Sequence, residues 1–415
     1  MICEKDLSAM GNQSITAVKG FLAGAMHCGI KQSGKPDLAM LVSCVPATAA
    51  AAFTTNKVVG APVVIGREHI RRGIAGACII NSGCANVCTG KRGLLDAREM
   101  CQRSAEALAG RGMALQTRDI LPFSTGVIGH FLPMDKIRGG IAELALTIGD
   151  SIEHGEAFAN GILTTDLKTK TALTQFKLGK RAITIAGCCK GSGMIAPNMA
   201  TMLAYVATDA AISTSALRAA VRDTADATFN CVTVDQHTST SDTFAVLANG
   251  LAENPRIEPG TTAWRSFSRA LETVCDSLAR QIAADGEGAT KLVIVHVNGA
   301  ATDSDARRAA MAIANSPLVK TAIHGGDPNW GRFVSAAGYS GAKMNPDKSQ
   351  CQVGSITVFR NGRPTEASLA EVQAAMRHSE VHITLNIGAG GKGTCRVYTC
   401  DLSREYIAIN ADYHT

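Results

Sequence analysis

Residues 190–203 read KGSGMIAPNMATML, a glycine-lined turn, a proline and a single threonine in an otherwise apolar stretch. The strand-like run 182–187 leads into this stretch, and the apolar run 202–206 leads out of it. The pattern predicts a strand, a tight turn and then a buried strand or helix. On this evidence alone, Thr201 could be an ordinary hydroxyl in the core.

The composition indicates a globular protein with a core of small aliphatic side chains. Apolar residues make up 46% of the 415 residues but aromatic residues only 4%, so the core must pack mainly alanine, valine, leucine and isoleucine. The net charge of +6 is spread along the chain without a long Lys/Arg block, which argues against a nucleic-acid partner. No run of about 18 apolar residues occurs, so we expect no membrane span.

The cysteines predict a reducing compartment. All 14 are scattered, and no Cys-x-x-Cys pair occurs, which is typical of buried, reduced thiols. The first residues show neither a signal peptide nor an Arg-rich transit peptide. We therefore expect a cytoplasmic protein.

Apolar runs and amphipathic periodicity alternate along the whole chain. We expect strands at residues 38–44, 62–66, 77–80, 182–187, 292–297 and 381–385. We expect helices at residues 95–108, 134–148, 214–227, 262–284, 303–314 and 368–377, the third capped by Ser213 or Thr214. Polar and glycine-rich loops are expected at 81–86 and 122–129. This alternation predicts an α/β or α+β fold with layered sheets covered by helices, and the lack of a linker favours one interlaced unit.

Several common site motifs are incomplete in this chain. The segment 388–394 looks like a phosphate-binding loop, but Gly393 rather than Ser or Thr follows Lys392. The histidines lack metal-ligand spacing, and Cys84 and Cys88 have no second pair nearby, so no metal site is predicted. No Gly-x-Ser-x-Gly elbow is present, which removes the usual hydrolase route.

A threonine can act as a nucleophile when the chain is cut directly before it. Its new α-amine, with a reference pKa of about 7.7–8.0, can then accept the hydroxyl proton. Small Ala200 before Thr201 is compatible with such a cut. The pattern alone does not select Thr201 over the many other hydroxyls.

A series of ordered motifs resembles the ornithine acetyltransferase family, also called glutamate N-acetyltransferases, over essentially the whole chain. Besides residues 190–203, the matching segments are 19–21, 33–39, 81–83, 124–129, 162–166, 233–235, 238–240, 285–291, 327–332 and 410–415. The chain departs from the family pattern at Cys84, at Gln236-His237 and in the loop 388–394. These departures affect the expected geometry of the loops and the specificity for the acetyl donor, but not the expected catalytic residues.

The resemblance implies self-cleavage between Ala200 and Thr201. It would give an α chain of residues 1–200 and a β chain of residues 201–415, which stay together as one interlaced unit of the N-terminal-nucleophile type. Thr201 would be the nucleophile for cleavage and for acetyl transfer, while Thr125 and Gly126 would stabilise the oxyanion. The positions implied to contact substrate are Thr164, Lys190, Thr201, Glu287, Asn410 and Thr415.

The implied reaction moves an acetyl group from N-acetylornithine to glutamate in the cyclic route to arginine. Lys190 suits a substrate carboxylate, and Glu287 suits the ornithine ammonium. The resemblance implies no cofactor, acetyl-CoA as a second donor in some members, and an assembly of two α and two β chains. Two alternatives are an autoprocessing hydrolase of the same fold, and a glycine-loop nucleotide-binding or regulatory protein without covalent chemistry.

Overall fold

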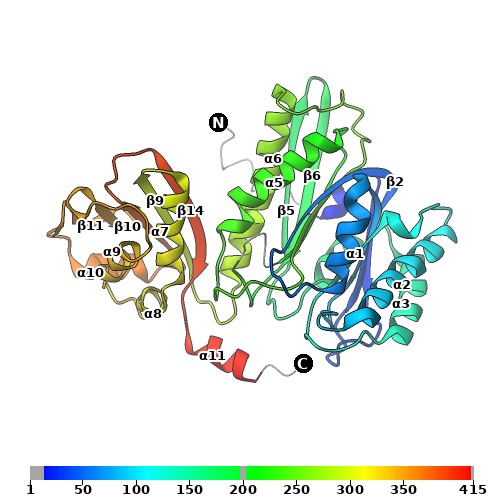
Figure 1. The fold of residues 1–415 in the computed structure, drawn as a ribbon, viewed down its shortest axis with the longest axis horizontal. Helices are drawn as coiled ribbons and strands as arrows, with labels where there is room; N and C mark the ends of the chain where they lie inside the picture. Colours follow the sequence, from blue (N-terminus) through cyan, green and yellow to red (C-terminus); the bar gives the residue numbers. More distant parts are fainter. Residues whose placement is uncertain (1–13, 197–201, 413–415) are drawn as a thin grey trace.

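The computed structural model describes residues 14–196 and 202–412, which form two sheets with helices packed against them (Figure 1). The larger sheet has the strand order β4-β3-β2-β8-β7-β6-β5, and β1 pairs with β2. Its strands are β1 Phe21–Met26, β2 Leu38–Phe53, β3 Ile74–Asn81, β4 Ile120–Ser124, β5 Lys170–Leu178, β6 Arg181–Lys190, β7 Leu203–Thr208 and β8 Thr243–Ala248. The expected layered α/β class is confirmed.

Strand β2 shows why the continuous apolar run at residues 38–44 predicted a buried strand. Leu38, Met40 and Val42 face one apolar layer, while Ala39 and Leu41 face the opposite layer. Side chains alternate along a strand, so a strand covered on both faces is apolar at every position. The large sheet is therefore a central layer with packed side chains above and below it.

Within the described part of the chain, six helices cover this central layer. They are α1 Ala61–His69, α2 Gly90–Ala109, α3 Met134–Thr147, α4 Ile152–Gly161, α5 Thr214–Ala227 and α6 Thr262–Ala284. Ser213 caps α5 by accepting a hydrogen bond from the Ala216 N–H, and Thr261 caps α6 by accepting one from Trp264. The bounds expected for α5 and α6 are confirmed.

The strand expected at residues 62–66 is wrong, because this segment belongs to helix α1. Pro62 lies in the first turn of the helix, where its missing N–H costs no hydrogen bond and its fixed φ suits the helix. A run of five apolar residues fits a buried strand and a buried helical turn equally well. The loop expected at 122–129 also begins later, because residues 122–124 still belong to β4.

The second sheet is built entirely from residues after position 290, in the order β12-β11-β10-β13-β9-β14. Its strands are β9 Leu292–Ala300, β10 Gln350–Val353, β11 Ile356–Arg360, β12 Arg363–Pro364, β13 Glu380–Asn386 and β14 Gly393–Cys400. The helices of this part are α7 Asp303–Asn315, α8 Pro317–Gly325, α9 Gly331–Gly338 and α10 Leu369–Met376. Helix α11, Arg404–Ala411, then leads the chain back toward the large sheet (Figure 1).

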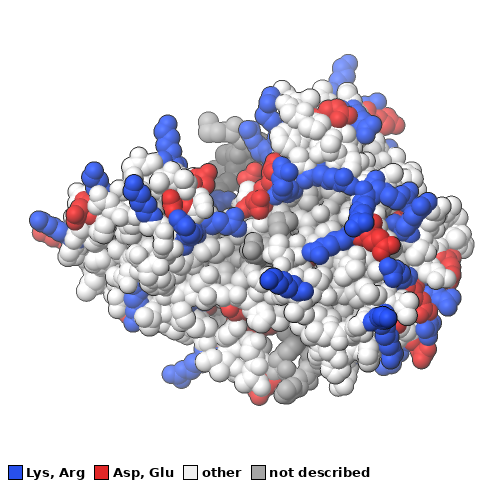
Figure 2. All heavy atoms as spheres, in the orientation of Figure 1, with Lys and Arg blue, Asp and Glu red and all other residues white. Residues whose placement is uncertain are grey.

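The surface charge is less evenly spread than the sequence suggests. On the face shown in Figure 2, Lys and Arg side chains gather over α1 and α5. Arg218 of α5 donates a hydrogen bond to the carbonyl of Arg71, which lies just after α1. This contact brings the basic side chains of the two helices close together. Among the described helices, none is long and apolar enough to cross a membrane.

Candidate active site

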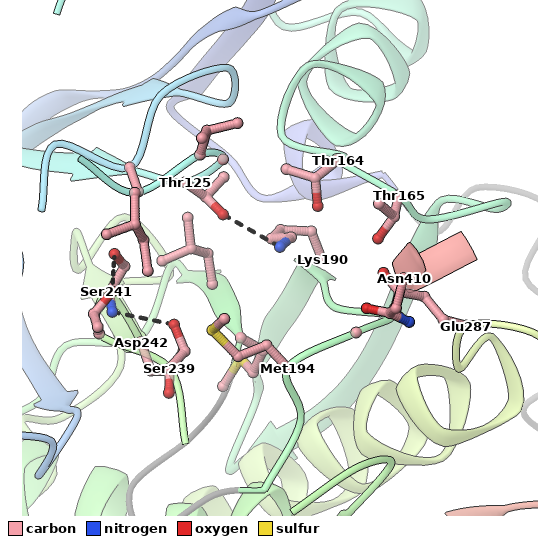
Figure 3. Close-up of a pocket in the computed structure, with 18 residues that line it drawn as sticks. Thr125, Thr164, Thr165, Lys190, Met194, Ser239, Ser241, Asp242, Glu287 and Asn410 are labelled. Atoms are coloured by element: carbon pink, nitrogen blue, oxygen red, sulfur yellow. Dashed lines mark hydrogen bonds between the residues drawn. The ribbon is translucent and has the colours of Figure 1, made fainter. Parts of the chain in front are cut away.

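A cavity of about 300 Å³ opens where loops of the large sheet meet the end of α6 and the returning helix α11. Six residues selected from the sequence line it, namely Thr125, Gly126, Thr164, Lys190, Glu287 and Asn410 (Figure 3). Ala200, Thr201 and Thr415 lie outside the described residues. Met194 and Met202, on either side of residues 197–201, also line the cavity.

Thr125 and Gly126 directly follow strand β4. The Thr125 N–H donates to the carbonyl of Asn81 at 3.0 Å, which fixes the start of the loop. Gly126 has φ +127°, and a Cβ at this position would lie 2.6 Å from the carbonyl carbon of Gly83. Only glycine fits, because the two loops touch backbone to backbone. The loop is therefore held so that the Thr125 hydroxyl is presented at the cavity wall.

Lys190 is the last residue of β6 and is only partly exposed. Its Nζ donates to the Thr125 hydroxyl at 3.3 Å. Removal from water lowers the pKa of Lys190, while the nearby charges of Asp166, Asp242 and Glu287 oppose that change. A desolvated ammonium at a cavity wall is suited to pair with a ligand carboxylate.

Glu287 and Asn410 form the opposite wall. Glu287 is 9% exposed, and its carboxylate accepts a hydrogen bond from the Asn410 side-chain amide at 2.9 Å. Its backbone N–H donates to the carbonyl of Ser192. A Cβ on Gly193 would lie 2.3 Å from the Glu287 carboxylate, so glycine at 193 leaves the space that this carboxylate fills. The Lys190 ammonium is directed toward Thr125, and the Glu287 carboxylate lies beside Asn410 (Figure 3).

A buried ionic network lies beneath this wall. Lys170, 1% exposed, places its ammonium 2.7 Å from Asp166 and 2.5 Å from Asp285. Asp166 also accepts the N–H of Gly191 at 2.6 Å and that of Thr164 at 3.1 Å. One carboxylate therefore connects two cavity segments that lie far apart in the sequence.

The charges in this network favour the ionised forms of Asp166 and Lys170. Burial alone would raise the pKa of Asp166, but the charges of Lys170 and Lys190 lower it to about 2. Burial alone would lower the pKa of Lys170, but Asp166 and Asp285 raise it above its ordinary value. A buried charge is tolerated when it is paired and hydrogen-bonded, as both are here.

The carboxylate of Asp235 holds the turn formed by residues 193–195. Asp235 accepts the N–H of Met194 at 2.7 Å and that of Ile195 at 2.9 Å. Met194 has φ +56°, a left-handed conformation in which these bonds hold it. Gln236, where the resembling family usually has glycine, also adopts a left-handed φ of +65°. A residue with a side chain is strained at this φ, so Gln236 adds backbone strain to the loop.

The chain also departs from the family pattern at Cys84 and in the loop 388–394, and only the first of these lies next to the cavity. Cys84 pairs with Val127 in an isolated bridge, and its thiol donates to the carbonyl of His130 at 3.3 Å. The loop 388–394 connects β13 to β14 in the second sheet and contributes no residue to the cavity wall. Among the described residues, no group of three or more His, Cys, Asp or Glu side chains could hold a metal ion.

The sequence did not reveal the whole wall. Thr165, Ser241 and Asp242 also line the cavity, and Lys170 supports it from below. Asp166 and Asp285 belong to segments that matched the family pattern, so their carboxylates could have been selected. Lys170 begins the edge strand β5, and nothing in the sequence pattern indicates that its ammonium is buried.

Comparison with known proteins points to one family over nearly the whole chain. A model of the ArgJ family matches residues 22–415. The arginine biosynthesis bifunctional protein ArgJ of Dehalococcoides mccartyi is 45% identical over 414 residues, which are 99% of this chain and 100% of the relative. The protein of the same name from Symbiobacterium thermophilum is 46% identical over 403 residues, 97% of this chain and 98% of the relative. A crystal structure of ornithine acetyltransferase complexed with ornithine, from Mycobacterium tuberculosis, is 35% identical with a TM-score of 0.42, and the match covers 46% of this chain and 98% of that one.

Proposed function

The chain belongs to the ArgJ family and is an acyltransferase, and we propose that it moves the acetyl group of N-acetylornithine to glutamate through an acetyl ester on Thr201. The observation that carries this proposal is the convergence of Thr125, Gly126, Lys190 and Glu287 on one cavity. That cavity is also lined by Met202, the residue next to Thr201 in the sequence.

We propose that the chain first cuts itself between Ala200 and Thr201. The resulting chains, residues 1–200 and 201–415, would still share the large sheet, because β6 pairs with β7 from Lys190↔Leu203 to Ile185↔Thr208. This pairing supports two chains that stay together after the cut. An assembly of two α and two β chains is part of the same proposal.

In the first half-reaction, the Thr201 hydroxyl attacks the acetyl carbonyl carbon while the Thr201 α-amine takes the hydroxyl proton. The hydroxyl of Thr125 and the N–H of Gly126 stabilise the negative oxygen that forms. The amide C–N bond then breaks, ornithine leaves with the proton on its nitrogen, and the acetyl group remains as an ester. In the second half-reaction, the amine of glutamate attacks that ester and regenerates Thr201.

The charges of the cavity fit both substrates. Lys190 pairs with the α-carboxylate that ornithine and glutamate share. Glu287, which accepts a hydrogen bond from the Asn410 amide, pairs with the side-chain ammonium of ornithine, while the Thr165 hydroxyl is a donor for the side-chain carboxylate of glutamate. Thr164 adds a hydroxyl at the same wall, and Thr415 completes the proposed set of substrate contacts. Acetyl-CoA is part of the proposal only as a second acetyl donor, which the resemblance to the family implies for some members.

The experiment that tests this proposal compares wild type with Thr201→Ala. Wild type should give two fragments on a denaturing gel, the second beginning at Thr201, and should form N-acetylglutamate from N-acetylornithine and glutamate. Thr201→Ala should remain one chain and lose acetyl transfer. Thr321→Ala, an exposed position on α8, is the matched control and should behave as wild type.

The same assay separates the proposed transferase from a hydrolase. A hydrolase would release free acetate at a rate independent of glutamate, whereas the transferase needs glutamate to turn over. An uncut wild-type chain that still transfers acetyl groups would refute the proposed mechanism.

A further inference from the structure

The segment just before the proposed cut is held by one loop, residues 233–238. The Val234 N–H donates to the carbonyl of Ile195 at 2.7 Å, and the Thr238 hydroxyl donates to the carbonyl of Ala196 at 2.9 Å. The carboxylate of the same loop also accepts two backbone N–H groups of this segment. The chain is thus fixed through both its N–H and its carbonyl groups as far as Ala196, shortly before the cut.

The loop 233–238 is itself supported from two directions. Lys320 of α8, which is 4% exposed, donates to the carbonyl of Val234 at 2.7 Å. The Asn56 side-chain amide, from the segment between β2 and α1, donates to the carbonyl of Thr238 at 2.9 Å. Because both supports bind backbone carbonyls, they fix the path of the loop and so the position of the Thr238 hydroxyl.

The chain after the cut is held by the large sheet instead. The Met202 carbonyl accepts the N–H of Thr243 at 3.0 Å, and β7 pairs with β6 and β8 from Leu203 onward. The sheet therefore holds the side that carries the nucleophile, Thr201, while the loop 233–238 holds the side that carries the scissile carbonyl. In acetyl transfer the attacked carbonyl belongs to the substrate, so that reaction needs the sheet but not the hold on the preceding segment.

We propose that Thr238 is a positioning residue for self-cleavage and has no part in acetyl transfer, an inference that rests on the proposed cut between Ala200 and Thr201. In the cut, the Thr201 hydroxyl oxygen attacks the Ala200 carbonyl carbon, and the peptide C–N bond breaks as its nitrogen takes up the hydroxyl proton. Water then hydrolyses the ester, which frees the Ala200 carboxyl group and restores the hydroxyl, so one water is consumed. The attack needs the two reacting atoms about 3–3.5 Å apart, and a segment anchored a few residues away reaches this geometry more often than an unanchored one.

The test follows the cut in newly made, full-length protein. Cell-free translation with a short radioactive pulse labels the new chain, and the loss of the full-length band on denaturing gels gives the cleavage rate. In Thr238→Val, which keeps the shape but removes the hydroxyl, this rate should fall about three- to ten-fold, the effect of one lost hydrogen bond. Thr238→Ser keeps the hydroxyl and should restore cleavage close to the wild-type rate. Thr321→Val, which removes an exposed hydroxyl that also donates to a carbonyl, is the matched control and should cut as wild type.

A second measurement separates positioning from a general loss of structure. Once Thr238→Val has been cut, acetyl transfer per mole of cut chain should equal that of wild type. An unchanged cleavage rate, or equal losses of cleavage and of transfer per cut chain, overturns this inference alone, whereas a wild-type chain that stays uncut overturns the proposed function as well. If Thr238→Val does not fold, Thr238→Ala also lacks the hydroxyl, and its cleavage at the wild-type rate equally overturns the inference.

Discussion

The two cavities differ in how their charged side chains are held. Around the candidate active site, Asp166, Asp235 and Asp285 accept backbone N–H groups as well as cations or neighbouring side chains. A second cavity, of about 1090 Å³, is lined by Arg280, Arg396 and Tyr398 among other residues. Around it, Arg396 pairs with Asp276 and Arg280 pairs with Glu380, each through side chains that are about one-third to one-half exposed.

This difference shows what each set of charges can do. A buried carboxylate that accepts backbone N–H groups fixes where two chain segments lie, so losing it changes geometry as well as energy. An exposed ion pair is screened by water and contributes little. Substitutions of the same chemical kind should therefore have large effects at the first cavity and small effects at the second.

The largest effect on stability is expected for Lys170→Met. Methionine has a similar shape but leaves Asp166 and Asp285 buried without their cation, and breaking a buried ion pair costs about 3–5 kcal/mol. The free energy of unfolding from urea titration should fall by this amount. A loss below about 1 kcal/mol would show that water already solvates these carboxylates and that the contrast between the cavities is wrong.

Comparison of Asp166→Asn with Asp285→Asn distinguishes an effect on the charge of Lys190 from a general loss of stability. Both remove a carboxylate from Lys170 and weaken backbone hydrogen bonds, but Asp166 also raises the pKa of Lys190. Lys190 loses its charge as pH rises through its lowered pKa, so removing Asp166 should move that loss to still lower pH. The alkaline fall of kcat/KM for N-acetylornithine should shift down by about one pH unit in Asp166→Asn.

Asp285→Asn is the matched control for this shift. It should lower stability by a similar amount while leaving the alkaline limb where it lies in wild type. Equal pH profiles for the two variants would mean that Asp166 acts through structure alone. Asp166→Glu, which keeps the charge, should retain the wild-type alkaline limb even if kcat/KM falls.

The sequence predicts the long helices and strands well, but it does not predict the buried charged residues that hold the cavity wall. Helices α5 and α6 and strand β9 were predictable because their apolar periodicity extends over many residues. Helix α1 was mistaken for a strand because five apolar residues carry too little periodicity. Strand β14 was not expected because its exposed face carries residues such as Arg396 that give no strand signal.

The candidate site shows the same limit. Thr125, Lys190 and Glu287 were selected because family motifs contain them, and the structure brings them to one cavity. Lys170 was not selected, because its place between two carboxylates arises from β5 meeting the end of α6 and leaves no local pattern. A residue whose role depends on contacts between distant segments can be identified only from the three-dimensional structure.

Gly193→Ala should change substrate affinity more than stability. The new methyl group would lie 2.3 Å from the Glu287 carboxylate, and this carboxylate can move because it ends a flexible side chain. Its displacement weakens the proposed pairing with the ornithine ammonium, so the KM for N-acetylornithine should rise about ten-fold, the equivalent of about 1.4 kcal/mol. Gly139→Ala in α3, where nothing lies within 4 Å of the new methyl group, should leave KM unchanged. An unchanged KM in Gly193→Ala would remove Glu287 from the proposed contacts.

The smallest effect is expected at the second cavity, for Asp276→Asn. This variant removes the carboxylate 2.6 Å from Arg396, but the arginine is half exposed and water replaces the lost partner. Unfolding in urea should show a loss of no more than about 1 kcal/mol, with kcat/KM unchanged. Because Asp276 also accepts the Tyr398 hydroxyl at 2.9 Å, Tyr398→Phe provides the matched control for that bond. A loss as large as that of Lys170→Met would mean that the second cavity is also organised by its charges, and the contrast between the two regions would fail.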